Sequence, residues 1–156
     1  MKFLVSKDTK PSPLLKMLMA GVTLAILFYL LLDILLHGYL LGDTISNIQA
    51  TLFGDESQFI EPILLETLLL QVHIDWFMTL FTVMILSSIY IRFYAMHKST
   101  PYFVHLLLLT SLLSPLLLLL AFFTVEWLVL LWISCFFLWH GLALLMAILI
   151  LGLFLR

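Results

Sequence analysis

Residues 102–155 read YFVHLLLLTSLLSPLLLLLAFFTVEWLVLLWISCFFLWHGLALLMAILILGLFL, two long apolar runs joined by a turn with a single charged residue, Glu126. Each run is long enough to supply the roughly 20 residues with which an α-helix crosses the hydrocarbon core of a bilayer. Because the turn at 124–126 is very short, the two helices are expected to pack as an antiparallel pair. The stretch therefore predicts transmembrane helices at roughly 102–123 and 127–155.

The rest of the chain has the same apolar character. Of its 156 residues, 64% are hydrophobic and 10% are charged, whereas a soluble domain carries about 25% charged residues. Further apolar runs at 17–41 and 73–95 predict two more spans. The sequence thus predicts an all-α fold, a polytopic integral membrane bundle of four transmembrane helices in which residues 1–156 form one domain within the lipid bilayer. The net charge of −2 gives no indication of nucleic-acid binding.

The segment 42–72 is different, because it is rich in acidic and amide side chains and contains no Lys or Arg. Asp43 or Thr44 can cap a short helix in which Ile45, Ile48 and Leu52 recur at helical spacing. We expect this amphipathic helix to lie on the bilayer surface. After a turn at residues 54–55, residues 61–62 (Glu-Pro) are expected to start a helix that runs directly into the second span.

The basic residues indicate the orientation in the membrane. All seven fall on one side of a four-span arrangement: Lys2, Lys7, Lys10, Lys16, Arg92, Lys98 and Arg156. Because an excess of Lys and Arg marks cytoplasmic segments, both termini are expected in the cytoplasm. Pro11 and Pro13 are expected to prevent any helix before the membrane. A bacterial inner membrane is the expected location, since the compact chain shows no recognisable organelle-targeting segment.

Polar side chains within the spans are candidates for function, because they are costly in lipid. Counting about 1.5 Å per residue from the basic end of each helix places Asp33, His37, His73 and His140 within about 8 Å of one another in depth. Asp33 and His37 share a helix face, so the carboxylate is expected to orient the imidazole. One interpretation is a b-type haem or a transition metal bound by His37, His73 and His140. In the other, these histidines are hydrogen-bonded to headgroups, to Asp33 or to each other.

A second polar feature is a stripe of Asp75, Thr79 and Thr82 on the second span, which hydroxyl groups on the third span could face. It could form a path for protons or ions. Ordinary hydrogen bonds between helices explain such small polar residues as well. We favour the second explanation, because no acidic residue continues the path beyond Asp75.

Three kinds of function agree with these patterns, and the sequence favours the first, because it requires only hydrophobic helices and a shaped loop. The first is an accessory or interaction subunit of a membrane complex, in which the acidic loop 42–72 contacts another subunit. The second is a haem- or metal-binding redox protein that uses the histidines and Asp33, and the third is a transporter or channel component. The sequence contains none of the motifs CxxCH, HExxH, GxSxG or Walker A, so it favours a role other than catalysis and suggests no catalytic residue.

Overall fold

The structure is a computed structural model that describes residues 12–154. Four of its helices are long and apolar enough to cross a membrane, and a fifth is short. The helices are α1 (Pro13–Leu40), α2 (Ile45–Phe53), α3 (Leu65–Tyr94), α4 (Thr100–Phe123) and α5 (Leu128–Phe154). The all-α membrane fold predicted from the sequence is confirmed.

The first helix begins earlier than the sequence indicated. The Ser12 hydroxyl accepts a hydrogen bond from the N–H of Leu15, and Pro13 is the first helical residue. Pro13, which was expected to prevent a helix before the membrane, starts α1 instead, because proline at the first helical position lacks only an N–H that is unpaired there anyway. Residues Lys2, Lys7, Lys10, Pro11 and Arg156 lie outside the described part of the chain.

The start of α3 also differs from the expectation. The helix begins at Leu65 rather than at Glu61 or Pro62. The reason is a tertiary contact: the N–H of Ile63 donates to the carbonyl oxygen of Thr51 at 2.8 Å, so the segment before Leu65 is tied to the end of α2. From Leu65 the helix continues without a break through the predicted second span.

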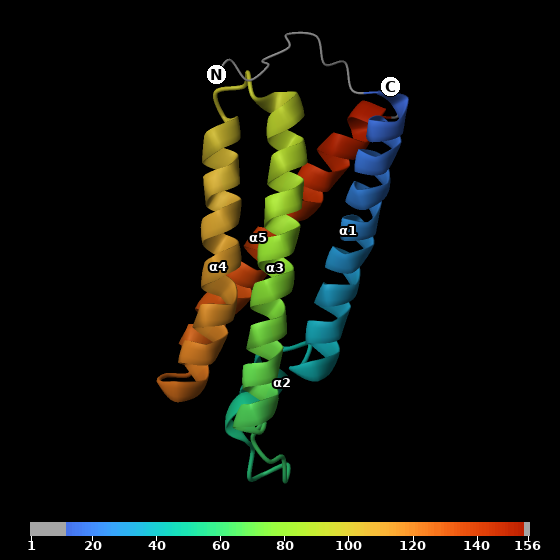
Figure 1. Cartoon of the computed structure of the whole chain (residues 1–156). Coiled ribbons are helices and arrows are strands. Elements are labelled where there is room, and N and C mark those ends of the chain that lie inside the picture. The colour runs from blue at the N-terminus through green and yellow to red at the C-terminus, as the bar shows by residue number, and fades with distance from the viewer. Residues whose placement is uncertain (1–11, 155–156) are drawn as a thin grey trace.

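Helix α5 organises the bundle. It crosses obliquely behind α3 and α4 and reaches α1 at the opposite end (Figure 1). It packs against α1, α2, α3 and α4, whereas α1 has few contacts with α3. Helix α1 begins and α5 ends at the same end of the bundle, which we call the terminal end (Figure 1). The opposite end carries α2 and is called the loop end.

Two apolar clusters form the core, one toward each end. The fully buried side chains of the terminal-end cluster include Leu30, Leu86, Leu107 and Met146. Those of the loop-end cluster include Leu41, Leu52, Leu68 and Val129. Many other leucine, isoleucine and phenylalanine side chains are exposed on the outside of the bundle, where lipid is the favourable surrounding.

Helix α2 is amphipathic, as expected, but it packs onto the bundle. The Thr44 hydroxyl caps it by accepting the N–H of Asn47 at 3.2 Å. Ile48 and Leu52 are buried against the loop-end cluster, while Ile45 is about half exposed. The helix that was expected at the bilayer surface thus packs against α5 at the loop end of the bundle.

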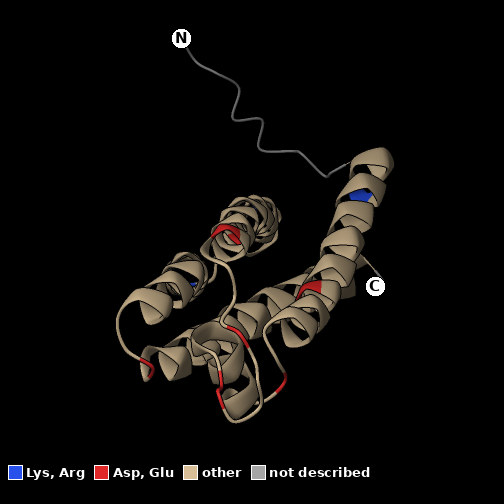
Figure 2. Cartoon of the chain, turned by 90° about the horizontal axis from the view of Figure 1, so that it is seen from below, with Lys and Arg blue, Asp and Glu red and all other residues tan. Residues whose placement is uncertain are grey.

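Charge is separated between the two ends. Figure 2, which views the molecule from the loop end, shows acidic residues on the segments that connect the helices there. The described basic residues are Lys16 near the start of α1, Arg92 near the end of α3, and Lys98 in the following turn. All three belong to the terminal end.

Candidate metal centre

A cluster of ionisable side chains lies between the two apolar clusters. Asp33 and His37 come from α1, Asp75 from α3 and His140 from α5. His140 is completely buried, and His37 and Asp33 are 5% and 8% exposed. Ionisable groups this deep in a membrane bundle are stable only when they are paired.

The pairing is continuous across three helices. His140 Nε2 lies 3.0 Å from Asp33 Oδ2, and His37 Nε2 lies 3.0 Å from Asp75 Oδ2. Gln71, one turn before Asp75 on α3, donates its amide N–H to Asp75 Oδ1 at 2.7 Å. Polar contacts within this cluster therefore connect α1, α3 and α5 to one another.

The second nitrogen of each histidine ring, Nδ1, determines where the hydrogen atoms of the Nε2–carboxylate contacts must lie. His37 Nδ1 is 2.9 Å from the backbone oxygen of Asp33, and His140 Nδ1 is 2.9 Å from that of Phe136. A carbonyl oxygen only accepts, so both Nδ1 atoms must donate. Each Nε2–carboxylate contact then needs one hydrogen between its two atoms. The orientation of each Nε2 toward a carboxylate is thus fixed by a backbone hydrogen bond on the other side of the ring.

A very small cavity lies beside Asp33, His37 and Asp75, but His140 is not part of its lining. Its volume is about 10 Å³, and its lining includes Asp33, His37, Asp75, Thr79 and Ser114. This is close to the smallest space that holds one water-sized body. One ligand atom each from Asp33, His37 and Asp75 lie within 4.8 Å of one another. Imidazole and carboxylate ligands together suit Zn²⁺, Mn²⁺ or Fe²⁺.

The structure brings together some of the residues selected from the sequence and separates others. His37 and His140 both contact Asp33, so the structure brings these three residues together. Asp33 Oδ1 lies 3.6 Å from His37 Nδ1, within ion-pair distance, but the hydrogen bond that orients the His37 ring goes to the backbone oxygen of Asp33, and the other carboxylate oxygen contacts His140. His37 is paired instead with Asp75, which the sequence had suggested only as part of a polar stripe.

His73 does not join the cluster. Its side chain is exposed, whereas Val72 and Thr79 of the same helix are buried. His73 and Asp75 are two positions apart, which turns their side chains about 200° apart around the helix axis. The sequence signal that could have identified the correct face of α3 is the pair Gln71 and Asp75, which are polar and one turn apart.

The geometry gives little room for a haem between His37 and His140. Phe136 fills the space between them, with its ring centroid 4.7 Å from that of His37 and 4.2 Å from that of His140. Both Nε2 atoms are also engaged by carboxylates. A small ion fits the available space better than a porphyrin.

The polar stripe on α3 ends in the apolar core. Thr79 and Thr82 are buried, and the next residues on this face, Val83 and Leu86, belong to the tightly packed terminal-end cluster. On α4, Ser111 donates its hydroxyl to a carbonyl of its own helix, Leu108, at 2.9 Å. Within residues 12–154, the stripe thus resembles ordinary helix packing more than a continuous polar path.

No protein-family model, curated protein or solved structure matches this chain. The buried cluster is therefore the feature on which a functional assignment rests.

Proposed function

We propose that this integral membrane protein binds a divalent transition-metal ion through Asp33, His37 and Asp75. Zn²⁺ is the ion with which the proposal is tested. The observation that carries the proposal is the convergence of these three ligand groups within 4.8 Å beside a cavity of water size. Two carboxylates offset part of the charge of a divalent ion that takes the place of the hydrogen between His37 Nε2 and Asp75, which reduces the cost of holding that ion away from water.

Neighbouring groups hold the ligands as a metal site requires. The hydrogen bond from His37 Nδ1 to the backbone of Asp33 leaves Nε2 as the ligand atom. Gln71 holds one oxygen of Asp75, and His140 holds one oxygen of Asp33. Such outer hydrogen bonds fix the orientation of ligands, and removing one typically costs about 10–100-fold in metal affinity. With three protein ligands, a fourth position remains for water or a substrate group.

Zinc binding to the purified protein in detergent tests this proposal. A competition titration against a chromophoric chelator should give one Zn²⁺ per chain, with metal–ligand distances of about 2.0–2.2 Å by X-ray absorption. His37→Gln and Asp75→Asn should each weaken binding by roughly 100-fold or more. The matched control is His73→Gln, an exposed histidine on the helix that carries Asp75, which should bind like the wild type. Equal losses in His73→Gln and His37→Gln would place the ion elsewhere.

We also propose that the site lies in the outer half of a cytoplasmic membrane. The support is the position of His37 near the loop end of α1 together with the acidic loop end and the basic terminal end. In a Cys135→Ala background, a single cysteine at Glu126 should react with a membrane-impermeant thiol reagent in intact cells. A cysteine at Lys98 should react only after the membrane is opened. The reverse labelling pattern would invert the orientation.

A second candidate is the accessory role, in which the loop 42–72 contacts another subunit. It is favoured by Phe59, which is 95% exposed and has a backbone φ of 56°. Backbone hydrogen bonds between Asp55 and Ile60, at 2.9 and 3.0 Å, hold the turn that presents it. An exposed, bulky residue held in this conformation is uncommon. Phe59→Ser should release a copurifying subunit while Zn²⁺ binding stays unchanged, and retention of the same subunits would remove this role from Phe59.

A further inference from the structure

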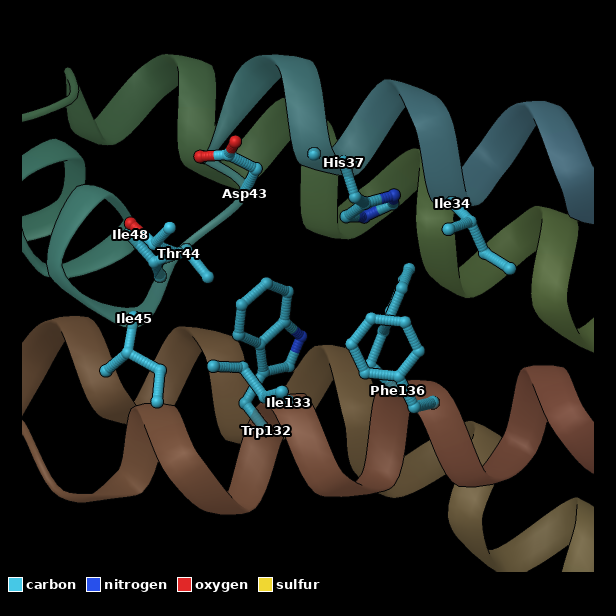
Figure 3. A pocket seen from close by; sticks show the side chains of 12 residues that line it. Ile34, His37, Asp43, Thr44, Ile45, Ile48, Trp132, Ile133 and Phe136 are labelled. Carbon is cyan, nitrogen blue, oxygen red and sulfur yellow. The ribbon is translucent and has the colours of Figure 1, made fainter.

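A second, larger cavity lies beside the metal centre, between α1, α2 and the first turns of α5 (Figure 3). Its volume is about 270 Å³, enough for an ion accompanied by several water molecules. The walls are mostly apolar, formed by isoleucine, tryptophan and phenylalanine side chains. Asp43 and Thr44 lie at its loop end, and His37 lies farther along α1, between them and Ile34 (Figure 3).

The two cavities share part of their lining. His37, Trp132 and Phe136 line both the larger cavity and the small one at the metal centre. The rings of His37 and Phe136 are in contact, with centroids 4.7 Å apart, and Trp132 lies 5.7 Å from Phe136. Only the thickness of these side chains therefore separates the larger cavity from the ligands of the metal centre.

The opposite side of the metal centre is closed among the described residues. The terminal-end cluster packs directly beyond it, with Leu30, Leu86 and Met146 fully buried. A cation crossing that cluster would lose its water without gaining ligands, which is very costly in a medium of low dielectric constant. The larger cavity instead offers polar groups along its length, His37 beside the metal centre and Asp43 and Thr44 at the acidic loop end.

We infer that the larger cavity is the route by which the metal ion reaches Asp33, His37 and Asp75 from the loop end of the bundle. This inference rests on the proposed metal-binding function. The aqueous cation is attracted by Asp43 and the neighbouring acidic loop, enters the cavity with part of its water, and exchanges that water for ligands at His37. Long-range attraction of this kind raises association rates and weakens with salt.

Glycine at position 38 allows the route to be blocked without disturbing the fold. Gly38 lines the larger cavity, and a Cβ added there would meet no atom within 4 Å. Gly38→Leu therefore extends a side chain into open space on a helix that favours leucine over glycine. Gly21→Leu is the matched control, because Gly21 lies on the same helix, is equally open, and is not part of the cavity lining.

The experiment measures rates of Zn²⁺ binding by stopped flow and rates of release by a chelator chase, on the purified full chain. Gly38→Leu should slow association and release by roughly tenfold or more each, leaving Kd within about twofold of the wild type. Gly21→Leu should leave both rates unchanged, and Asp43→Asn should slow association at low salt only. Wild-type rates in Gly38→Leu, or a weaker Kd with unchanged association, would overturn the route while metal binding stands. Absence of Zn²⁺ binding by the wild type would overturn the proposed function itself.

Discussion

Replacing Asp33 by alanine removes the carboxylate that joins α1 to α5, and its effect on stability can be worked out from the contacts. In Asp33→Ala, Nε2 of the completely buried His140 loses its neighbour at 3.0 Å. His140 Nδ1 keeps its bond to the backbone of Phe136, so the ring cannot turn to find another partner without losing that bond. One buried nitrogen is then left unpaired.

The expected cost follows from two contributions. A buried polar group without a partner costs about 1–3 kcal/mol. Hydrogen bonds between membrane helices contribute about 0.6 kcal/mol on average and about 1.7 at most. We therefore expect Asp33→Ala to lower the free energy of unfolding by about 2 kcal/mol. Asp33→Asn should cost less than about 1 kcal/mol, because its amide N–H can donate to Nε2 of a neutral His140.

The assay is unfolding in mixed micelles with a denaturing detergent, followed by circular dichroism and by tryptophan fluorescence. The double variant Asp33→Ala/His140→Leu should be no less stable than Asp33→Ala alone, since both members of the pair are then apolar. If Asp33→Ala were within about 0.5 kcal/mol of the wild type, or if Asp33→Asn were equally destabilised, the unpaired imidazole would not be the cause.

Three further outcomes are expected. Leu107→Ala, at a fully buried position, should destabilise the protein by about 2–4 kcal/mol, whereas Leu109→Ala, 64% exposed on the same helix, should leave the unfolding midpoint nearly unchanged. Hydrogen bonds from the Ser57 hydroxyl and N–H hold the pKa of the Asp55 carboxyl below its ordinary 3.8. The stabilisation of the turn by these hydrogen bonds to the ionised carboxylate is therefore present at neutral pH and disappears as the pH falls through the folded-state pKa of Asp55. Ser57→Ala should raise the Asp55 pKa toward 3.8, which carbon NMR of the carboxyl can measure; an unchanged pKa would assign the shift to another group. Gly54→Ala should cost roughly 1–3 kcal/mol, because Gly54 has φ 84° and ψ 163°, a conformation almost restricted to glycine; a wild-type unfolding midpoint would show that the turn relaxes.

Part of the candidate site could be predicted because depth in a membrane helix is nearly a matter of counting. The rise of about 1.5 Å per residue placed Asp33, His37 and His140 at similar heights without any knowledge of packing. Counting heights also explains why the sequence suggested His73 as a ligand and Asp75 only as part of a polar stripe. His73 and Asp75 are two positions apart, so their heights are too similar to distinguish them, but their side chains face opposite sides of α3.

The sequence by itself determined the four spans, the short capped helix after the first span, and the similar heights of Asp33, His37 and His140 along their helices. These follow from hydrophobic length, capping chemistry and helical rise, which are local properties of the chain. The tertiary structure alone decided that His37 pairs with Asp75 and His140 with Asp33. It also decided that α3 starts at Leu65 and that a cavity lies beside His37. The physical reason is that helix rotation and tilt are set by side-chain packing between helices distant in sequence, above all by the oblique path of α5 (Figure 1).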